Sequence, residues 1–491
     1  MAVIKWPREG KPPVLLKLRS SAGLIVTCCS FAVFTDIFLY AVIVPIMPFS
    51  LETQVGIEAN RVQYWVSISL AVYGAALLVF SPIWGYIADR IGNRRLPMLV
   101  GLVMLTAATV ILCLSKTLAM FMAGRALQGI SASLTWTVGL ALVIDSVDSK
   151  DVGKATGWIG MSTSLGVLSA PLLGGVVYAK GGYYQVFSMC FGLLAVDIAL
   201  RLAIIEVKEA KRWLDQAANL PSLDPEGNPQ GTLKGSHGVT AEGALTTPLP
   251  EKRAEDAQPE VPVTPQEASR TSQSPLGTLV KLLRQPRLLS ALWGTVVQAL
   301  IVTSFDSTLP LLVSDTFGWN SVGGGLIFLP VILPSFGSPA IGALGDRFGP
   351  KWLATFGFFF ATPFLICLRF VSEDSMADKV LLCGLLVGIG IAMAFVFGPL
   401  MAEINWAVQG DEQGDGQSSD EVPVAQAYGL YNMAFSAGTM LGPIMGGLIR
   451  DSSGFGTVGW ALAIVSFLSA IPQLIWTGGP LGVKFQAGSR S

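Results

Sequence analysis

Apolar residues follow one another in long, nearly uninterrupted runs along most of the chain, and short polar segments separate the runs. This is neither the alternating pattern of a half-buried strand nor the one-sided stripe of a surface helix. Each run holds about 20 residues, and a helix of that length crosses the ~30 Å hydrocarbon layer of a bilayer. We therefore expect an all-α integral membrane protein with about twelve transmembrane helices.

The runs fall into two groups of about six, which predict two six-helix halves. In the first half, spans are expected at approximately residues 23–45, 62–84, 97–115, 118–144, 155–178 and 184–204. In the second half, they are expected at approximately residues 288–312, 320–343, 352–371, 380–405, 424–449 and 457–477.

The division of the chain follows from these spans. We expect an N-terminal tail over residues 1–22, a first half over 23–205, a second half over 288–478 and a C-terminal tail over 479–491. The segment 206–287 is rich in Pro, Gly, Ser, Thr and charged residues. It has too little apolar surface to fold alone, so it is predicted to be a disordered linker.

Composition excludes several functions. Of 491 residues, 52% are hydrophobic and 13% charged, against about a quarter charged in soluble domains. The net charge of −1 gives no basic field for nucleic acid. The six cysteines lack metal-ligand spacing, the one histidine is His237 in the linker, and no phosphate loop or hydrolase motif occurs. We expect neither an enzyme nor a bound metal or cofactor.

Basic residues predict the orientation, because they gather on the cytoplasmic side of membrane proteins. If both tails are cytoplasmic, the loops of the opposite side hold only a few basic residues: Arg61, Lys116, Lys180, Arg369, Lys379 and Arg450. The first apolar run is too long for a cleaved signal peptide and reads as a retained span. Both termini are therefore predicted to be cytoplasmic.

An internal repeat marks the same place in both halves. The element G-x-x-x-D-R-x-G, followed by basic residues, occurs after the second and again after the eighth predicted span, at Gly85, Asp89, Arg90, Gly92, Arg94 and Arg95, and at Gly342, Asp346, Arg347, Gly349 and Lys351. The glycines allow helices to approach closely, and the charges can form a latch between the halves. Alternatively, the basic residues are topology signals alone.

With this repeat, the chain resembles the major facilitator superfamily, in which the element is the signature loop. The resemblance implies two pseudo-symmetric halves around a central transport path. It covers nearly all of the chain outside the tail and linker. The long linker and the acidic segment between the tenth and eleventh spans resemble fungal members.

Three elements resemble the proton-coupled drug antiporters and vesicular amine transporters of that superfamily. Arg125 and Gln128 match an R-x-x-Q-G element of proton-linked members. A G-x-x-x-G-P-x-x-G-G element of antiporters is complete in the eleventh span and has Ala170 for one glycine in the fifth. Its residues are Gly438, Gly442, Pro443, Gly446 and Gly447, and Gly166, Pro171, Gly174 and Gly175. They are expected to form a smooth helix interface; plain helix packing is the alternative.

Ionisable residues inside apolar spans are candidates for substrate or proton binding, because placing one in the bilayer costs about 2.5–3.5 kcal/mol or more. Asp36 and Asp306 lie in the first and seventh spans and match acids of vesicular amine transporters. Burial favours the neutral form of a carboxylate and would let either acid exchange a proton. Alternatively, one of them pairs with Arg125 and only holds the helices together.

Two further polar positions are weaker candidates. Glu403, near the cytoplasmic end of the tenth span, is interpreted either as a gate or as an ordinary interfacial acid. Asn432 stands where vesicular amine transporters carry an acid in the eleventh span. The missing acid makes the expected cavity less negative, which favours a larger and less charged substrate than a monoamine.

These features predict a secondary transporter that exports drugs or secondary metabolites in exchange for protons, with the proton gradient as its energy source. The expected partners are a small organic substrate, protons and the lipid bilayer, and the protein is expected to act as a monomer. The cell membrane is the favoured location, with vacuolar or vesicular membranes next. A uniporter or symporter for a small nutrient and a non-transporting membrane sensor remain the alternatives.

Overall fold

The computed structural model describes residues 15–91, 94–147, 152–205, 284–337, 347–409 and 424–478, with isolated residues at 210, 213, 341, 344 and 345. Nearly all of them belong to one compact unit built from Met1–Ala210 and Lys281–Ser491. Most of the predicted linker 206–287, residues 1–14 and 479–491 of the two tails, and the acidic segment 410–423 lie outside the described residues.

Six long helices make up the first half, after the short helix α1 (Leu16–Arg19). A short helix α3 (Met47–Ser50) and a π-helical turn (Leu51–Val55) connect the first two of them. Ser21 begins the first long helix by accepting a hydrogen bond from the amide of Leu24. The six are α2 (Ala22–Ala41), α4 (Ala59–Ile91), α5 (Arg95–Cys113), α6 (Leu118–Ser146), α7 (Val152–Gly181) and α8 (Tyr183–Ala203).

The second half follows the same order with one interruption. Its continuous long helices are α11 (Pro286–Phe317), α15 (Pro350–Cys367), α16 (Met376–Gln409), α17 (Val424–Ser453) and α18 (Phe455–Trp476). Between α11 and α15 the chain forms α12 (Ser321–Leu326), α13 (Leu329–Ile332) and a 3₁₀ turn (Leu333–Gly337), and a second 3₁₀ turn (Leu368–Phe370) follows α15. No strand occurs within the described residues.

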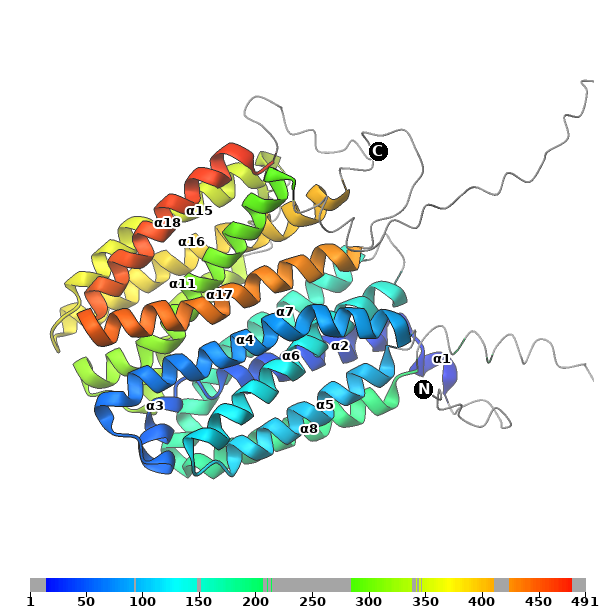
Figure 1. Ribbon diagram of the computed structural model, residues 1–491, viewed down its shortest axis with the longest axis horizontal. Coiled ribbons are helices and arrows are strands. Elements are labelled where there is room, and N and C mark those ends of the chain that lie inside the picture. The colour runs from blue at the N-terminus through cyan, green and yellow to red at the C-terminus, as the bar shows by residue number, and fades with distance from the viewer. Residues whose placement is uncertain are drawn as a thin grey trace, which may run out of the picture. The chain divides into compact units, whose positions relative to one another are not determined.

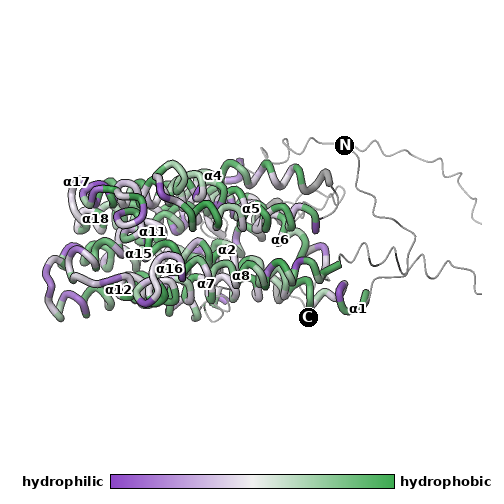
Figure 2. The backbone as a smooth tube through the Cα atoms, turned by 90° about the horizontal axis from the view of Figure 1, so that it is seen from below, coloured by the Kyte–Doolittle hydropathy of each residue, from purple (hydrophilic) through white to green (hydrophobic). Residues whose placement is uncertain are grey.

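The helices confirm an all-α membrane fold. Among the described residues, ten helices are long and apolar enough to cross a bilayer. The segment Ser321–Gly337 is a shorter apolar helical stretch, and α17 coincides with the predicted eleventh span without being among the ten. Figure 2 shows hydrophobic residues along most of the bundle.

One predicted span differs from the structure. A continuous helix was expected over approximately residues 320–343, but the helix breaks after Leu326 and again at Ile332. Pro330 and Pro334 lack the amide hydrogen that a helix interior needs, and three consecutive glycines (323–325) precede them. Both effects weaken the helix within this span.

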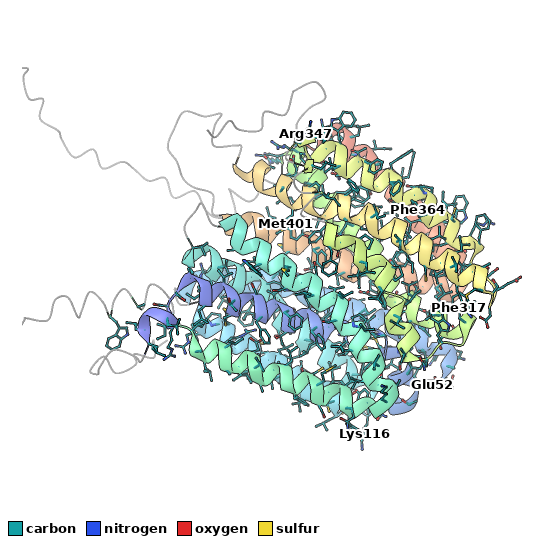
Figure 3. All side chains as sticks on the ribbon, turned by 180° about the vertical axis from the view of Figure 1, so that it is seen from behind. Glu52, Lys116, Phe317, Arg347, Phe364 and Met401 are labelled. Atoms are coloured by element: carbon teal, nitrogen blue, oxygen red, sulfur yellow. The ribbon has the colours of Figure 1, made fainter. Side chains whose placement is uncertain are left out.

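The two faces of the bundle can be told apart by the helix ends. We call the side where α2 begins at Ala22 and α18 ends at Trp476 the terminal side, and the opposite side, where α2 ends and α4 begins, the far side. Figure 3 places Glu52, in the π-helical turn before α4, and Lys116, between α5 and α6, on the far side, and Arg347 and Met401 toward the terminal side.

Close helix packing joins the two halves. Helix α4 of the first half runs along α17 of the second (Figure 1), so closely that a Cβ on Gly74 would lie 2.6 Å from the backbone nitrogen of Met440. On the far side α7 packs on α12. There a Cβ on Gly175 would overlap the carbonyl oxygen of Ser321. Glycine is required at such positions because any side chain would push the helices apart.

Candidate functional site

A buried arginine lies where helices of both halves meet. Arg125 on α6 is 0% exposed, and its Nη1 donates a hydrogen bond to Oε1 of Gln128 at 2.6 Å. Its guanidinium carbon lies 5.2 Å and 5.0 Å from the ring centres of Tyr40 on α2 and Tyr73 on α4. Two aromatic faces thus hold the cation away from water, an arrangement worth about 2 kcal/mol or more per desolvated contact. The Nε and Nη2 atoms have no hydrogen-bond partner.

Asp306 joins this group from the other half. The hydroxyl of Tyr40 donates a hydrogen bond to Oδ2 of Asp306 on α11 at 2.9 Å. The structure therefore brings together Arg125, Gln128 and Asp306, three of the predicted coupling residues. Direct pairing, the alternative reading, does not occur between these described side chains: Tyr40 stands between the guanidinium and the carboxylate. We call Arg125, Gln128, Tyr40, Tyr73 and Asp306 the central cluster.

Asp36 lies one helical turn from Tyr40 on α2, four residues toward the terminal side. It is 1% exposed, and neither carboxylate oxygen has a hydrogen-bond partner. A buried charge without a partner is strongly unfavourable, whereas the neutral acid is tolerated much better. Asp36 is therefore placed where gaining or losing a proton has a large energetic effect.

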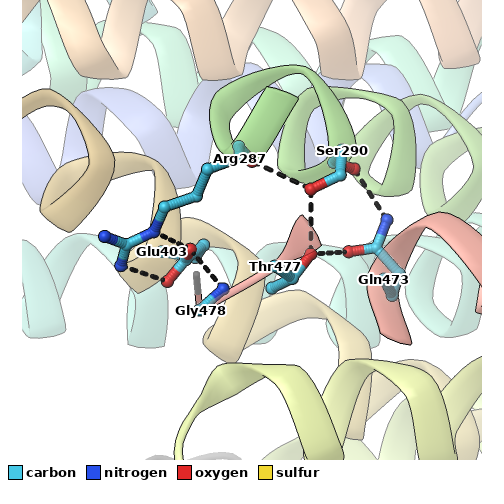
Figure 4. Close-up of polar contacts among 6 residues, drawn as sticks. All are labelled: Arg287, Ser290, Glu403, Gln473, Thr477 and Gly478. Atoms are coloured by element: carbon cyan, nitrogen blue, oxygen red, sulfur yellow. Dashed lines mark hydrogen bonds and ion pairs between the residues drawn. The ribbon is translucent and has the colours of Figure 1, made fainter. Parts of the chain in front are cut away.

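Glu403 is held by a dense set of polar contacts on the terminal side (Figure 4). Its side chain is fully buried on α16. Nε and Nη2 of Arg287, at the start of α11, donate to its two carboxylate oxygens at 2.5 Å and 3.0 Å, and the amide of Gly478 donates at 2.7 Å. Both partners belong to the second half. Glu403 therefore clamps α11, α16 and the end of α18 together in this conformation.

Asn432 makes a contact between the halves. Its side-chain amide on α17 donates to the hydroxyl of Ser81 on α4 at 3.1 Å, and the asparagine is 8% exposed. It does not join the central cluster through any hydrogen bond of the described residues. This hydrogen bond links α17 to α4.

The predicted latch is described in part. Arg94 forms an ion pair with Asp145 near the end of α6 at 3.5 Å, and Arg95 donates to the carbonyl of Leu202 at 3.0 Å. Arg347 is exposed, with its guanidinium carbon 5.5 Å from the ring centre of Phe348. The latch residues that lie outside the described side chains are Asp89, Arg90, Gly92, Gly342 and Asp346.

The remaining latch residues lie on helices at the terminal side. A Cβ on Gly85 of α4 would meet a methyl of Thr137 at 3.6 Å, an ordinary contact. Gly349 precedes α15 with a φ of 84°, a backbone region that favours glycine, and Lys351 lies in the first turn of that helix.

The glycine motif lies at helix contacts, as predicted. On α17, side chains at Gly438, Gly442 and Gly446 would collide with α11, and one at Gly447 would collide with Ser67 of α4. On α7, the glycines meet α2, the turn after it and α12: Gly166 faces Ile37, Gly174 faces Val42 of the turn after α2, and Gly175 faces Ser321. Pro171 and Pro443 lie inside α7 and α17.

The sequence reasoning missed a second buried ion pair. Arg201 on α8 donates to both carboxylate oxygens of Asp197 at 3.0 Å and 2.8 Å and to the carbonyl of Met98 at 2.7 Å. Both charged residues are at most 1% exposed. Opposite charges four residues apart in an apolar run were the available signal, because residues at that spacing meet on a helix.

It also missed a polar tie on the far side. Arg450 on α17 hydrogen-bonds the side chain of Gln63 on α4 and donates to Oδ2 of Asp315 on α11 at 2.7 Å. Gln63 in turn donates to the carbonyl of Ser307 at 3.0 Å. Together with Tyr40 and Asp306, these contacts close the far side between the halves.

Comparison with known proteins identifies the family. The family description Major Facilitator Superfamily matches residues 27–419. The chain belongs to the major facilitator superfamily. Members of this superfamily are multi-pass membrane transporters and not enzymes, and the helical fold described above is that of the family.

Relatives that match over most of this chain support the same conclusion. The chain is 31% identical to an MFS-type transporter, ppzB, of the fungus Metarhizium rileyi over 94% of this chain and 96% of that protein. It is 26% identical to the class B tetracycline resistance protein of Escherichia coli, over 76% and 79% of the two chains. It is 24% identical to the chromaffin granule amine transporter of Rattus norvegicus, over 83% and 64%.

A solved structure shares the fold. The human organic anion transporter MFSD10 superposes with a TM-score of 0.60 at 16% identity, over 94% of this chain and all of that one. The resemblances to the superfamily, to its drug and amine transporters and to fungal members, which the sequence predicted, are thereby confirmed.

Proposed function

We propose that this transporter exports an organic substrate, a drug or secondary metabolite, in exchange for protons by alternating access. The observation that carries the proposal is the hydrogen bond from Tyr40 to Asp306, which spans the two halves beside buried Arg125. Asp36, buried and without a hydrogen-bond partner one turn away, supports it. The likeness to the tetracycline resistance protein and to an amine transporter also supports the proposal.

The contact between Tyr40 and Asp306 gives the coupling a physical form. While Asp306 is ionised, its carboxylate is a strong acceptor for the tyrosine hydroxyl, and the nearby Arg125 stabilises its charge. A proton on Asp306 removes that charge and weakens the hydrogen bond that closes the halves. Protonation therefore favours separation of the halves at this level, and loss of the proton favours closure. Asp36 is the second proton-binding group.

The wider setting of the proposal is the cell membrane of a fungal cell, with both termini in the cytoplasm and the protein acting as a monomer. Energy comes from the proton gradient, and no cofactor takes part. The full-length likeness to a fungal MFS-type transporter supports the fungal setting, and the basic residues of the tail and short loops support the orientation.

The test is transport by purified protein in liposomes with an imposed pH difference. Wild type should accumulate at least one drug of a test panel against its concentration gradient, and a protonophore should abolish the accumulation. Asp306→Asn and Asp36→Asn should lose gradient-driven accumulation but keep substrate exchange at zero pH difference, because an amide cannot cycle a proton. Tyr40→Phe should lower the accumulation that a given pH difference supports, since it removes the hydrogen bond through which the proton on Asp306 acts on the two halves.

Asp374→Asn is the matched control, because Asp374 is an exposed acid that pairs with Lys379 outside the central cluster. It should behave as wild type. Accumulation that ignores the protonophore, or that persists undiminished in both Asp36→Asn and Asp306→Asn, would overturn the proposal and leave a facilitator.

A further inference from the structure

A cavity lies away from the central cluster. It has a volume of about 860 Å³ and lies on the terminal side, where α2 and the beginning of α7 flank the end of α6. A cavity of this size accommodates a drug-sized molecule. Its described lining residues are Ala22, Gly23, Val26, Thr27, Ser30, Phe31, Phe34, Ser146, Val147, Ala155, Trp158, Ser162 and Leu165.

The chemistry of the lining is apolar and aromatic. Phe31 and Phe34 stand one turn apart on α2, with ring centres 5.9 Å apart, and Trp158 contributes from α7 with 53% of its surface exposed. The described lining residues include no charged side chain. An ionised ligand would lose water without gaining a counter-charge from them, whereas a neutral aromatic ligand gains contact with the rings.

One polar atom in this cavity has no partner. The hydroxyl of Ser30 is buried, with the residue 7% exposed, and it makes no hydrogen bond. Serine hydroxyls inside helices commonly bond a carbonyl of the preceding turn, as Ser146 does to Leu142 at 2.6 Å. Buried polar atoms without partners are uncommon in folded proteins, and a ligand group is one of the partners that satisfies them.

The cavity lies on the terminal side of the central cluster. Ser30 precedes Asp36 by six residues on α2, which corresponds to an axial rise of about 9 Å. The two side chains lie on different faces of the helix, about 120° apart. A molecule bound at Ser30 therefore sits below the level of the central cluster, toward the terminal side.

We propose that this cavity binds the substrate before translocation, and that the substrate is an uncharged, aromatic organic molecule with a hydrogen-bonding group that meets Ser30. This inference rests on the proposed export function and names the substrate class for it. Export of such a molecule from the terminal side begins with binding between α2 and α7.

The experiment measures binding without any gradient, so that coupling does not enter. Purified protein in lipid nanodiscs is titrated with N-phenyl-1-naphthylamine, a neutral fluorescent probe with one N–H group, and with 8-anilino-1-naphthalenesulfonate, which has the same rings and a negative charge. Empty nanodiscs give the background. The neutral probe should bind saturably, and the anionic probe should bind at least about tenfold more weakly.

Matched variants locate the site. Ser162→Trp fills the cavity and should weaken binding of the neutral probe at least about tenfold, whereas Ser164→Trp, two residues along the same helix and not in the lining, should leave it unchanged. Ser30→Ala should weaken binding about 2- to 10-fold, the effect of one hydrogen bond. Ser69→Ala removes another buried hydroxyl without a partner, outside the cavity, and should have no effect.

Equal affinities for the two probes, or equal effects of Ser162→Trp and Ser164→Trp, would overturn the inference. Transport that proves independent of the proton gradient would remove the proposed antiport and leave the binding result standing. Gradient-driven transport without selective binding of the neutral probe would leave the proposed antiport standing and overturn the substrate site in this cavity.

Discussion

The clamp around Glu403 offers a stringent test of the structure. Replacing Arg287 with glutamine removes the cation that donates two hydrogen bonds to the carboxylate, at 2.5 Å and 3.0 Å, and leaves the amide of Gly478 as a hydrogen-bond donor and Lys351 as a nearby cation. Glu403 is fully buried, so the remaining charge has no access to water. We expect Arg287→Gln to destabilise the second half.

The magnitude follows from these contacts. Each hydrogen bond to a charged group contributes about 1.5–3 kcal/mol, and breaking a buried ion pair costs about 3–5 kcal/mol. The Arg287 side chain is 32% exposed, so solvent screens part of the interaction. A loss of about 2–4 kcal/mol is the expected result, and for a unit the size of one half this lowers the melting temperature by roughly 4–16 °C.

The assay is thermal unfolding of purified protein in detergent at one fixed heating rate, because unfolding of such proteins is commonly irreversible. Asp374→Asn, which breaks the exposed pair with Lys379, is the control and should cost less than about 1 kcal/mol. The double variant Arg287→Gln/Glu403→Gln should recover part of the stability, since no buried charge remains. The reasoning is refuted if Arg287→Gln is no less stable than the control, or if the double variant is as unstable as the single one.

Two further predictions concern a buried ion pair and a close helix contact. Asp197→Asn leaves Arg201 buried without its counter-charge, so the free energy of unfolding should fall by about 3–5 kcal/mol. The double variant Asp197→Leu/Arg201→Met buries no charge and should lose less of this free energy. Thermal unfolding of both variants measures the difference. Gly74→Ala places a methyl group 2.6 Å from the backbone of Met440, so transport should fall at least about tenfold, because separating α4 from α17 shifts the central cluster. Gly139→Ala, where a Cβ meets nothing within 4 Å, should transport normally, and equal rates for the two variants would count against the packing argument.

The helices were predictable because the bilayer sets their length. A run of about 20 apolar residues has no other stable fold in lipid, and the predicted spans agree with the observed helices to within a few residues at most ends. The exception is the segment Ser321–Gly337, where hydropathy indicated one helix and the backbone breaks. Hydropathy counts apolar side chains and ignores the missing amide hydrogens of Pro330 and Pro334.

The candidate site was predictable as a set of residues but not as a set of contacts. Asp36, Arg125 and Asp306 stood out because charges are rare in apolar spans. That Tyr40 lies between Arg125 and Asp306 depends on how α2, α6 and α11 meet, and no spacing in a single helix contains that information. For the same reason, the sequence could not distinguish a gate from an ordinary acid at Glu403, because its partner Arg287 lies 116 residues away in the chain.

Because the two halves repeat the same helix order, acids at equivalent places in them can be compared. Asp145 and Glu403 each stand 27 residues after the first residue of their helix (145 − 118 and 403 − 376), so they occupy equivalent places on α6 and α16. Asp145 is 31% exposed and pairs with Arg94 of the signature loop at 3.5 Å, a geometry worth about 1 kcal/mol or less. Glu403 is fully buried and accepts two hydrogen bonds from Arg287. A contact that holds a moving body together can be strong. The pair of Asp145 and Arg94 lies within the first half and links α6 to the residue before α5, whereas the clamp of Glu403 fits a second half that moves as one rigid unit.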